Sequence, residues 1–216
     1  MKSPPQSLPA YDADCRACPR LATFLDAVRN EYSDYFCQPV PAFGARKPKL
    51  LIVGLAPGLH GANRTGRPFT GDYAGVLLYE TLHRFGFASG PESVSADDSL
   101  RLQDCRVTNA VKCLPPQNKP LPIEIRACNH FLRNEIASLP RSTVILALGT
   151  IAHAAVLTAV GLKVGHCKFR HGAKHLLPGG RVLFDSYHCS RYNTNTRRLT
   201  EEMFHAVFAG IREHMN

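Results

Sequence analysis

Four short apolar runs, separated from one another by helical patterns, constrain the fold of this chain more than any other feature. The runs lie at residues 49–56, 105–111, 143–149 and 181–187. Apart from 105–111, which has polar interruptions, they are nearly continuous in apolar residues, as strands buried on both faces are. Helical patterns lie at 19–30, 75–85, 122–138, 150–160 and 196–214. This alternation predicts an α/β fold, a three-layer αβα sandwich around a central four-stranded, mostly parallel sheet.

Length and hydropathy predict one soluble domain. A chain of 216 residues fits a single domain over 1–216, and its proline-rich start predicts a flexible N-terminal tail at 1–12. No apolar run approaches the roughly 20 residues that span a membrane. The polar N-terminus also lacks the apolar core of a signal peptide. We therefore expect a cytoplasmic protein without membrane contacts.

The charge of the chain favours a polyanionic partner. Its 26 lysines and arginines against 17 acidic residues give a net charge of +9, and nucleic acid is the simplest partner for such an excess. The loop 164–180, rich in Lys, Arg and His, is a candidate for contact with a nucleic-acid backbone. The alternative is a basic enzyme whose charge is incidental.

Polar side chains follow three of the predicted strands. The glycine-rich loop 54–72 comes after the first strand, Asn109 ends the second, and His188 follows the fourth. Because ligands of open α/β sheets bind outside the carboxyl ends of the strands, we expect these groups in one cleft. Phe69 can stack on a base there, and Asp72 supplies a carboxylate.

Each of these residues also has a structural interpretation. Phe69 can pack in the core, Asp72 can cap the helix that follows it, and His188 can be a satisfied structural histidine.

The eight cysteines raise the question of a metal, because disulfides are rare in a reducing cytosol. Cys15 and Cys18 form a C-x-x-C pair, and Cys113 and Cys128 lie further along the chain in polar surroundings. Four thiolates can hold a zinc ion or an iron–sulfur cluster, and the spacing leaves the choice open. Free thiols that pack as small apolar groups are the alternative. The remaining cysteines are Cys37, Cys105, Cys167 and Cys189.

Three segments resemble the motifs of the uracil-DNA glycosylase superfamily, most closely those of family 5, the type-B enzymes. They read GLAPGLHGANRTGRPFTGD, TNAVKCLPPQNKP and SYHCSRYNTNTRRLT, and the resemblance extends from Cys15 to Thr200 in the same order. Leu55 stands where the related family-4 enzymes carry Glu. Cys189 stands where the family usually has Pro, which relaxes the backbone after His188.

The resemblance implies a four-stranded parallel sheet in an αβα sandwich and a [4Fe-4S] cluster. It assigns the cluster to Cys15, Cys18, Cys113 and Cys128.

The implied activity is that of a DNA glycosylase in base excision repair. Such an enzyme hydrolyses the N-glycosidic bond of uracil, and of other deaminated bases such as hypoxanthine and xanthine, in double-stranded DNA. The target nucleotide must leave the stacked duplex, which costs a few kcal/mol. No lysine in the motifs is placed as a Schiff-base nucleophile, so we expect a monofunctional enzyme that leaves an abasic site. We expect a monomer without an obligate protein partner.

The catalytic residues predicted on this basis are Asp72, His188 and Asn109. Asp72 would balance the positive sugar or orient water, His188 would donate to a carbonyl oxygen as negative charge grows, and Asn109 would position the base. Predicted substrate contacts are Phe69, Gly54, Ala56, Gly58, His60, Asn63, Arg67, Ser190, Arg191 and Tyr192, with Arg191 and Tyr192 as candidates to wedge the helix.

Two other classes of protein compete with this interpretation. A non-catalytic nucleic-acid-binding module with a structural metal site fits the charge and the cysteines, and Asp72 and His188 argue against it. A nucleotide hydrolase would normally carry the P-loop pattern G-x-x-x-x-G-K-[ST], which this chain lacks.

Overall fold

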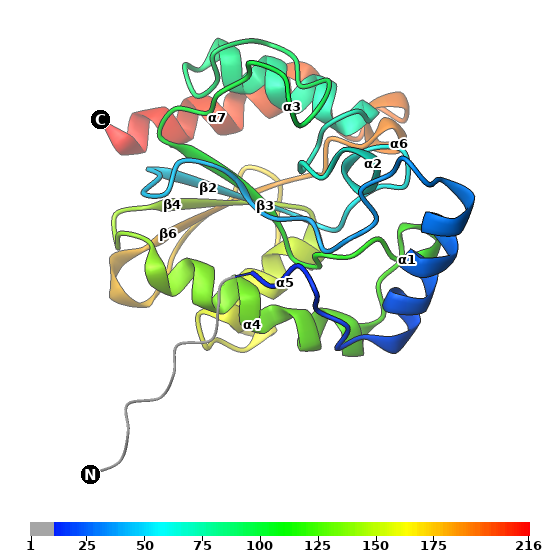
Figure 1. Ribbon diagram of the computed structural model, residues 1–216. Helices are drawn as coiled ribbons and strands as arrows, with labels where there is room; N and C mark the ends of the chain where they lie inside the picture. Colours follow the sequence, from blue (N-terminus) through cyan, green and yellow to red (C-terminus); the bar gives the residue numbers. More distant parts are fainter. Residues whose placement is uncertain (1–10) are drawn as a thin grey trace.

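A six-stranded sheet forms the centre of the molecule, which we describe from a computed structural model for residues 11–216 (Figure 1). The strand order is β1-β3-β2-β4-β6-β5. The strands are β1 (Phe43–Gly44), β2 (Leu50–Gly54), β3 (Cys105–Asn109), β4 (Val144–Leu148), β5 (Lys174–Leu176) and β6 (Val182–Ser186). β3, β2, β4 and β6 run parallel. Residues 1–10 of the tail predicted at 1–12 lie outside the described residues.

The sequence predicts four strands, whereas the sheet has six. The four predicted strands form the parallel centre, and β1 and β5 add antiparallel pairings at the two edges. These edge strands have two and three residues. A hydrophobic alternation needs a longer window to be recognised, so no sequence pattern marked them.

Helices cover both faces of the sheet, which confirms the three-layer architecture. In Figure 1, α3 and α7 lie on one face of the sheet, and α4 and α5 lie on the other. The helices are α1 (Pro19–Glu31), α2 (Ala62–Thr65), α3 (Tyr73–Arg84), α4 (Pro122–Ser138), α5 (Thr150–Ala159), α6 (Arg191–Asn195) and α7 (Glu201–Met215), with 3₁₀ turns at Pro116–Asn118, Val164–His166 and Pro178–Gly180. None of the helices within residues 11–216 is long and apolar enough to cross a membrane.

Strand β2 shows why the apolar runs are continuous. Leu50 and Ile52 belong to the core beneath α3 and α7, whereas Leu51 and Val53 belong to the core beneath α4 and α5. Successive side chains of a strand point to opposite faces, and here both faces are covered. The run therefore has no polar position.

The predicted helix at 196–214 is wrong at its start. α6 ends at Asn195 and α7 begins only at Glu201. Between them Arg197 takes a left-handed backbone with φ 56°, and the Thr200 side chain accepts a hydrogen bond from the Met203 N–H. Threonine is a favoured N-cap, so the helix starts after it.

Candidate active site

A cavity of about 1080 Å³ opens at the carboxyl ends of the central strands. Its walls come from the loop after β2, from Gly149 and Thr150 after β4, and from Tyr187 and His188 after β6. A ligand site at this edge is what a parallel sheet predicts. The segment 92–94, which no sequence pattern singled out, lines the cavity as well.

Asp72 combines the two roles that its sequence position allows. As the N-cap of α3, its Oδ1 accepts a hydrogen bond from the Gly75 N–H at 3.0 Å. Its other oxygen, Oδ2, lies against Gly61, where an added Cβ would approach to 2.4 Å. Burial raises the pKa of Asp72, and the N–H groups of Gly75 and Ala74 oppose this rise. The residue also lines the cavity, so a desolvated carboxylate faces its interior.

Phe69, Asn109 and His188 converge beside the cavity. The pairing of β2 with β3 sets Gly54 opposite Asn109. A Cβ at Gly54 would lie 2.5 Å from both Asn109 Oδ1 and Phe69 Cζ, so only glycine allows the approach. The Phe69 and His188 rings are nearly parallel, with centroids 5.8 Å apart. Within residues 11–216, the buried Asn109 Oδ1 accepts no hydrogen bond.

The spacing of the two rings bears on how a base could bind. A base stacked between two rings needs about 7 Å, because each face contact takes about 3.5 Å. Phe69 and His188 are closer than this, at 5.8 Å. A base therefore fits between them only if the rings separate further, and it otherwise lies alongside them.

His188 is held in a neutral state at the end of β6. Burial lowers the pKa of His188 to about 4. Its backbone carbonyl accepts a hydrogen bond from Asn193 Nδ2 at 2.8 Å. The fully buried Cys189 donates from its thiol to the Ala74 carbonyl at 3.3 Å. These two contacts fix the segment that the missing proline would otherwise leave free.

Several of the predicted substrate contacts lie at the cavity. Its lining includes Ala56, Gly58, His60, Ser190 and Arg191. The Ser190 side chain caps α6 by accepting from the Asn193 N–H, and the Arg191 guanidinium lies 5.0 Å from the centre of the Tyr73 ring. Tyr192 lies outside this lining and is 72% exposed, so its ring is free to contact a partner.

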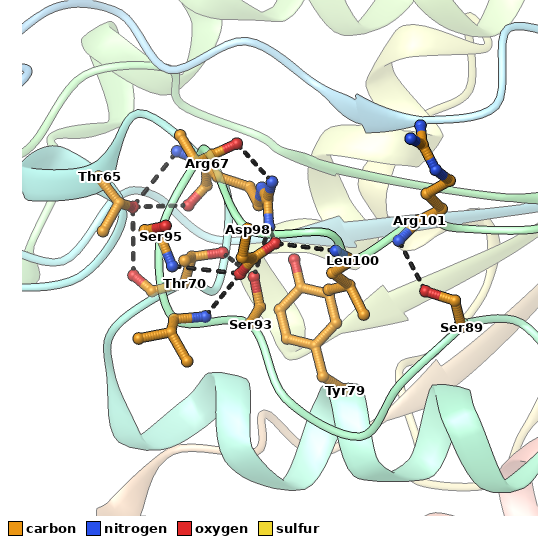
Figure 2. A network of polar contacts seen from close by, with 12 residues as sticks. Thr65, Arg67, Thr70, Tyr79, Ser89, Ser93, Ser95, Asp98, Leu100 and Arg101 are labelled. Carbon is orange, nitrogen blue, oxygen red and sulfur yellow. Dashed lines mark hydrogen bonds and ion pairs between the residues drawn. The ribbon is translucent and has the colours of Figure 1, made fainter.

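Two predicted contacts lie away from the cavity. Asn63 is fully buried and donates from Nδ2 to Cys37 Sγ at 3.5 Å. The Arg67 guanidinium is buried against a different segment, where Nη1 lies 2.5 Å from Asp98 Oδ1 and Nη2 donates to the Ala96 carbonyl at 2.6 Å (Figure 2). Neither residue belongs to the lining of the cavity, and the Arg67 guanidinium already has partners inside the protein, although Asn63 Oδ1 accepts no hydrogen bond from the described residues.

Some lining residues escaped the sequence analysis. Ser93 and Val94 belong to a polar loop without a motif, and Phe169 lies in the basic loop that we assigned only to backbone contact. Arg198 lines the cavity and lies 4.8 Å from the centre of the Tyr187 ring. Arg198 lies further along the chain from Tyr187 than Arg191 does, so the sequence did not indicate this pairing.

The four cysteines of the predicted metal site surround one small space. Cys15, Cys18, Cys113 and Cys128 line a second cavity between α1, the end of β3 and α4. Burial, and the charge of the neighbouring cysteines, raise the pKa of Cys18 to about 11 and that of Cys113 to about 12. The Lys112 N–H donates to Cys128 Sγ at 3.3 Å. Thiols with raised pKa values ionise at neutral pH only when a positively charged group binds them.

A different group of side chains is close enough together to hold a single ion. Within residues 11–216, the one group of three His, Cys, Asp or Glu donors within 4.8 Å of one another is His153, His175 and Asp185.

Fold and site together define an α/β protein with a cavity at the carboxyl edge of a parallel sheet, lined by an acid and a histidine. The sequence profile of the Uracil DNA glycosylase superfamily matches residues 41–212. The chain is 51% identical over 197 residues to the type-5 uracil-DNA glycosylase of Thermus thermophilus, which covers 88% of this chain and 89% of that protein. The chain therefore belongs to the uracil-DNA glycosylase superfamily, as its motifs indicated.

Two further relatives carry the same description. The type-5 uracil-DNA glycosylase of Mycobacterium bovis is 42% identical over 202 residues, covering 90% of this chain and 75% of that protein. The type-5 uracil-DNA glycosylase of Pyrobaculum aerophilum is 40% identical over 193 residues, covering 88% of this chain and 84% of that protein.

Proposed function

We propose that this protein is a uracil-DNA glycosylase of the type-5 kind, which hydrolyses the bond between uracil and deoxyribose in double-stranded DNA and leaves an abasic site. The position of Asp72 and His188 at one cavity, with Phe69 stacked on His188 and with Phe69 and Asn109 both against Gly54, carries the proposal. The identity to type-5 enzymes over most of the chain supports it.

Base recognition centres on Asn109. Its buried Oδ1 has no partner within residues 11–216, and leaving such an acceptor unpaired costs about 1–3 kcal/mol. A flipped uracil offers an N–H donor beside a carbonyl acceptor, and one amide matches both. The buried Phe69 ring next to Asn109 supplies the apolar contact for the face of the base.

Bond cleavage separates a positive sugar from a negative base. The Asp72 carboxylate, desolvated at the cavity wall, stabilises positive charge on the sugar and orients the attacking water. His188, neutral because burial lowers its pKa to about 4, donates a hydrogen bond to a base carbonyl without giving up its proton. A donor aimed at developing negative charge typically contributes about 10²–10³ in rate.

The cysteine cavity fits a [4Fe-4S] cluster. Cys15, Cys18, Cys113 and Cys128 would hold it, because these four thiols line one space and a [4Fe-4S] cluster takes four thiolate ligands. The bound cluster would supply iron–thiolate bonds that tie α1 to the segments after β3 and within α4. The chemistry at Asp72 and His188 needs no electron from it.

The range of bases is the finer part of the proposal. Leu55 and Ala56 present apolar surface to the cavity, which suits hypoxanthine and xanthine as well as uracil. The expected monomer and cytoplasmic location stay predictions.

A panel of labelled duplexes tests the proposal. Each carries uracil, hypoxanthine or xanthine at one position, and alkali cuts the strand wherever a base has been removed. We expect cleavage of the uracil duplex that depends on both enzyme and alkali. Binding to every duplex without cleavage would instead favour the nucleic-acid-binding module, and cleavage without alkali would contradict a monofunctional enzyme.

A further inference from the structure

The Arg67 guanidinium is shared among three acceptors of one segment, residues 93–98 (Figure 2). Nη1 donates to Asp98 Oδ1 at 2.5 Å and to Ser93 Oγ at 3.0 Å, and Nη2 donates to the Ala96 carbonyl at 2.6 Å. The guanidinium also lies 4.2 Å from the centre of the Phe43 ring. With 6% of the residue exposed, the side chain cannot reach a phosphate without breaking these contacts.

Asp98 is oriented for this pairing by its own backbone. Its Oδ2 accepts from the N–H groups of Val94 and Ser95 at 2.9 and 3.2 Å, and its Oδ1 accepts from the Leu100 N–H at 3.1 Å. The carboxylate thus closes the loop 93–98 on itself and offers one oxygen to Arg67. Arg67 and the loop therefore behave as one rigid unit.

A second set of bonds fixes the residues on either side of Phe69. Thr70 Oγ1 lies 2.7 Å from Ser93 Oγ, and the Tyr79 hydroxyl donates to the Pro68 carbonyl at 2.7 Å. Between them Phe69 has φ 55°, a left-handed backbone that is strained for a residue with a side chain. Its carbonyl packs so closely on Gly75 that an added Cβ there would clash.

We infer that Arg67 is a positioning residue of this site: through residues 93–98 it holds Phe69 in its strained conformation and keeps Ser93 and Val94 at the cavity wall. The inference rests on the proposed function, in which Phe69 contacts the flipped base. It replaces the interpretation of Arg67 as a substrate contact. Such strain persists only where the surroundings over-determine it, and Arg67 joins the chain just before Phe69 to residues 93–98 by three side-chain hydrogen bonds.

Arg67→Lys is the first test, because lysine keeps the charge and loses the fork that serves three acceptors. We expect the single-turnover rate of uracil release to fall about 10-fold, equivalent to roughly 1.4 kcal/mol. The matched control is Arg101→Lys, an exposed arginine at the end of the same loop whose backbone N–H, not its guanidinium, bonds to Ser89. Its rate should stay within about 2-fold of wild type.

Two results would assign Arg67 a different role. If Arg67 binds phosphate, Arg67→Gln, which removes the charge, will weaken DNA binding and lower its salt slope by about 1. If Arg67 is only structural, Arg67→Lys will lower the melting temperature. The rate of uracil release, measured below that temperature, will stay at the wild-type value. Either result overturns the inference.

A double-mutant cycle shows whether Arg67 acts through Phe69. In a Phe69→Ala background, Arg67→Lys should change the rate less than 2-fold, because the group it positions is gone. If the fold-losses in rate from Arg67→Lys and Phe69→Ala instead multiply in full in the double variant, the inference is overturned. Ser93→Ala, which removes one contact to Arg67 and one to Thr70 while leaving the ion pair with Asp98, gives the same test if Arg67→Lys does not fold.

An optical reading is independent of activity. The chain has no tryptophan, so Phe69→Trp creates a single indole reporter at the strained position. Adding Arg67→Lys should raise its quenching by acrylamide and lower its anisotropy, whereas adding Arg101→Lys should change neither. Unchanged quenching overturns the inference even if the wild type releases uracil. If the wild type releases no uracil, the proposed function is overturned. The quenching and anisotropy of the indole then still test whether Arg67 positions residue 69.

Discussion

At the scale of single residues, glycines determine how closely the groups of the site approach one another. Gly54 admits Phe69 and Asn109 to the end of β2, and Gly61 admits the Asp72 carboxylate to the cavity wall. In each place an added Cβ would lie within 2.6 Å of the group concerned. The glycine-rich loop therefore brings the site's own side chains together.

Gly54→Ala should abolish most of the activity while the protein still folds. The new methyl would displace Phe69 or Asn109, and a misplacement of about 1 Å at a reacting site can cost about 100-fold in rate. Overpacking should lower stability by about 1–3 kcal/mol. Uracil release and thermal unfolding measure the two effects. The control is Gly165→Ala, where an added Cβ meets nothing within 4 Å; a Gly54→Ala enzyme as fast as this control would contradict the packing described here.

Asp72 and His188 together predict that the rate of uracil release falls at acid pH in a single step. Burial raises the pKa of Asp72 above its ordinary value of 3.8, so the carboxylate, and with it the rate, should be lost as the pH falls through that raised pKa. Burial lowers the pKa of His188 to about 4, so the neutral donor persists above that pH. Single-turnover rates across acid pH measure this. A second limb near the ordinary histidine value of 6.5 would show that His188 titrates in the working range.

At the scale of secondary-structure elements, α1 joins the cysteine cavity to the glycine-rich loop. Its N-terminal end follows Cys15 and Cys18, and just beyond its C-terminal end the Cys37 N–H donates to the Asn63 carbonyl at 3.1 Å. The Phe36 N–H donates in the same way to the Arg64 carbonyl. Loss of the group held by the cysteines should therefore loosen the loop that carries Phe69 and Asp72.

Cys15→Ala should remove the bound iron and destabilise the fold. We expect the brown absorbance to vanish and the melting temperature to fall by roughly 10 °C, since each kcal/mol corresponds to about 2–4 °C in a chain of this size. Iron analysis and a thermal melt measure both. Cys167→Ala is the control, because that thiol lies outside the cysteine cavity. Full iron content in Cys15→Ala would refute the ligand assignment.

The elements were predictable where a pattern is local. Runs buried on both faces gave the four central strands, and Asp72 marks the start of α3 by its capping chemistry, whereas the cap at Thr200 was missed. The rule for parallel sheets then brought Asn109 and His188 to one edge. The edge strands β1 and β5 were not predictable, because two or three residues carry no period.

The partners of buried polar residues were beyond the sequence. An arginine that binds phosphate and one that pairs with an aspartate 31 residues away look the same in a motif, and Arg67 is of the second kind. Asn63 shows the same limit, since its partner Cys37 precedes the loop altogether. Only packing in three dimensions distinguishes these cases.

At the scale of the whole molecule, the positive charge is the main attraction for DNA. In the loop after α5, Phe169 lines the cavity while the exposed Lys168 and Arg170 flank it. We expect these two cations to contact the phosphates on either side of a flipped nucleotide.

Replacing both Lys168 and Arg170 with Gln should weaken DNA binding and reduce its dependence on salt. Each lost phosphate contact lowers the slope of log K against log salt by about 0.9, so the pair should lower it by about 2. Titrations at several salt concentrations measure this. The control is Lys47→Gln, an exposed lysine just before β2, at the opposite edge of the sheet. An unchanged slope in the double variant would move the DNA to another face.

The most direct test of the account compares wild type with Asp72→Asn in one measurement, the free uracil released from a U·G duplex in a single turnover. Asparagine is as good an N-cap as aspartate, so α3 and the fold should be preserved. We predict rapid release by the wild type, and at least a 100-fold slower release by Asp72→Asn with DNA affinity unchanged, in line with the loss of a charge-stabilising group. Equal release by the two proteins, or none by the wild type, would contradict the assignment of this cavity as the active site of a uracil-DNA glycosylase.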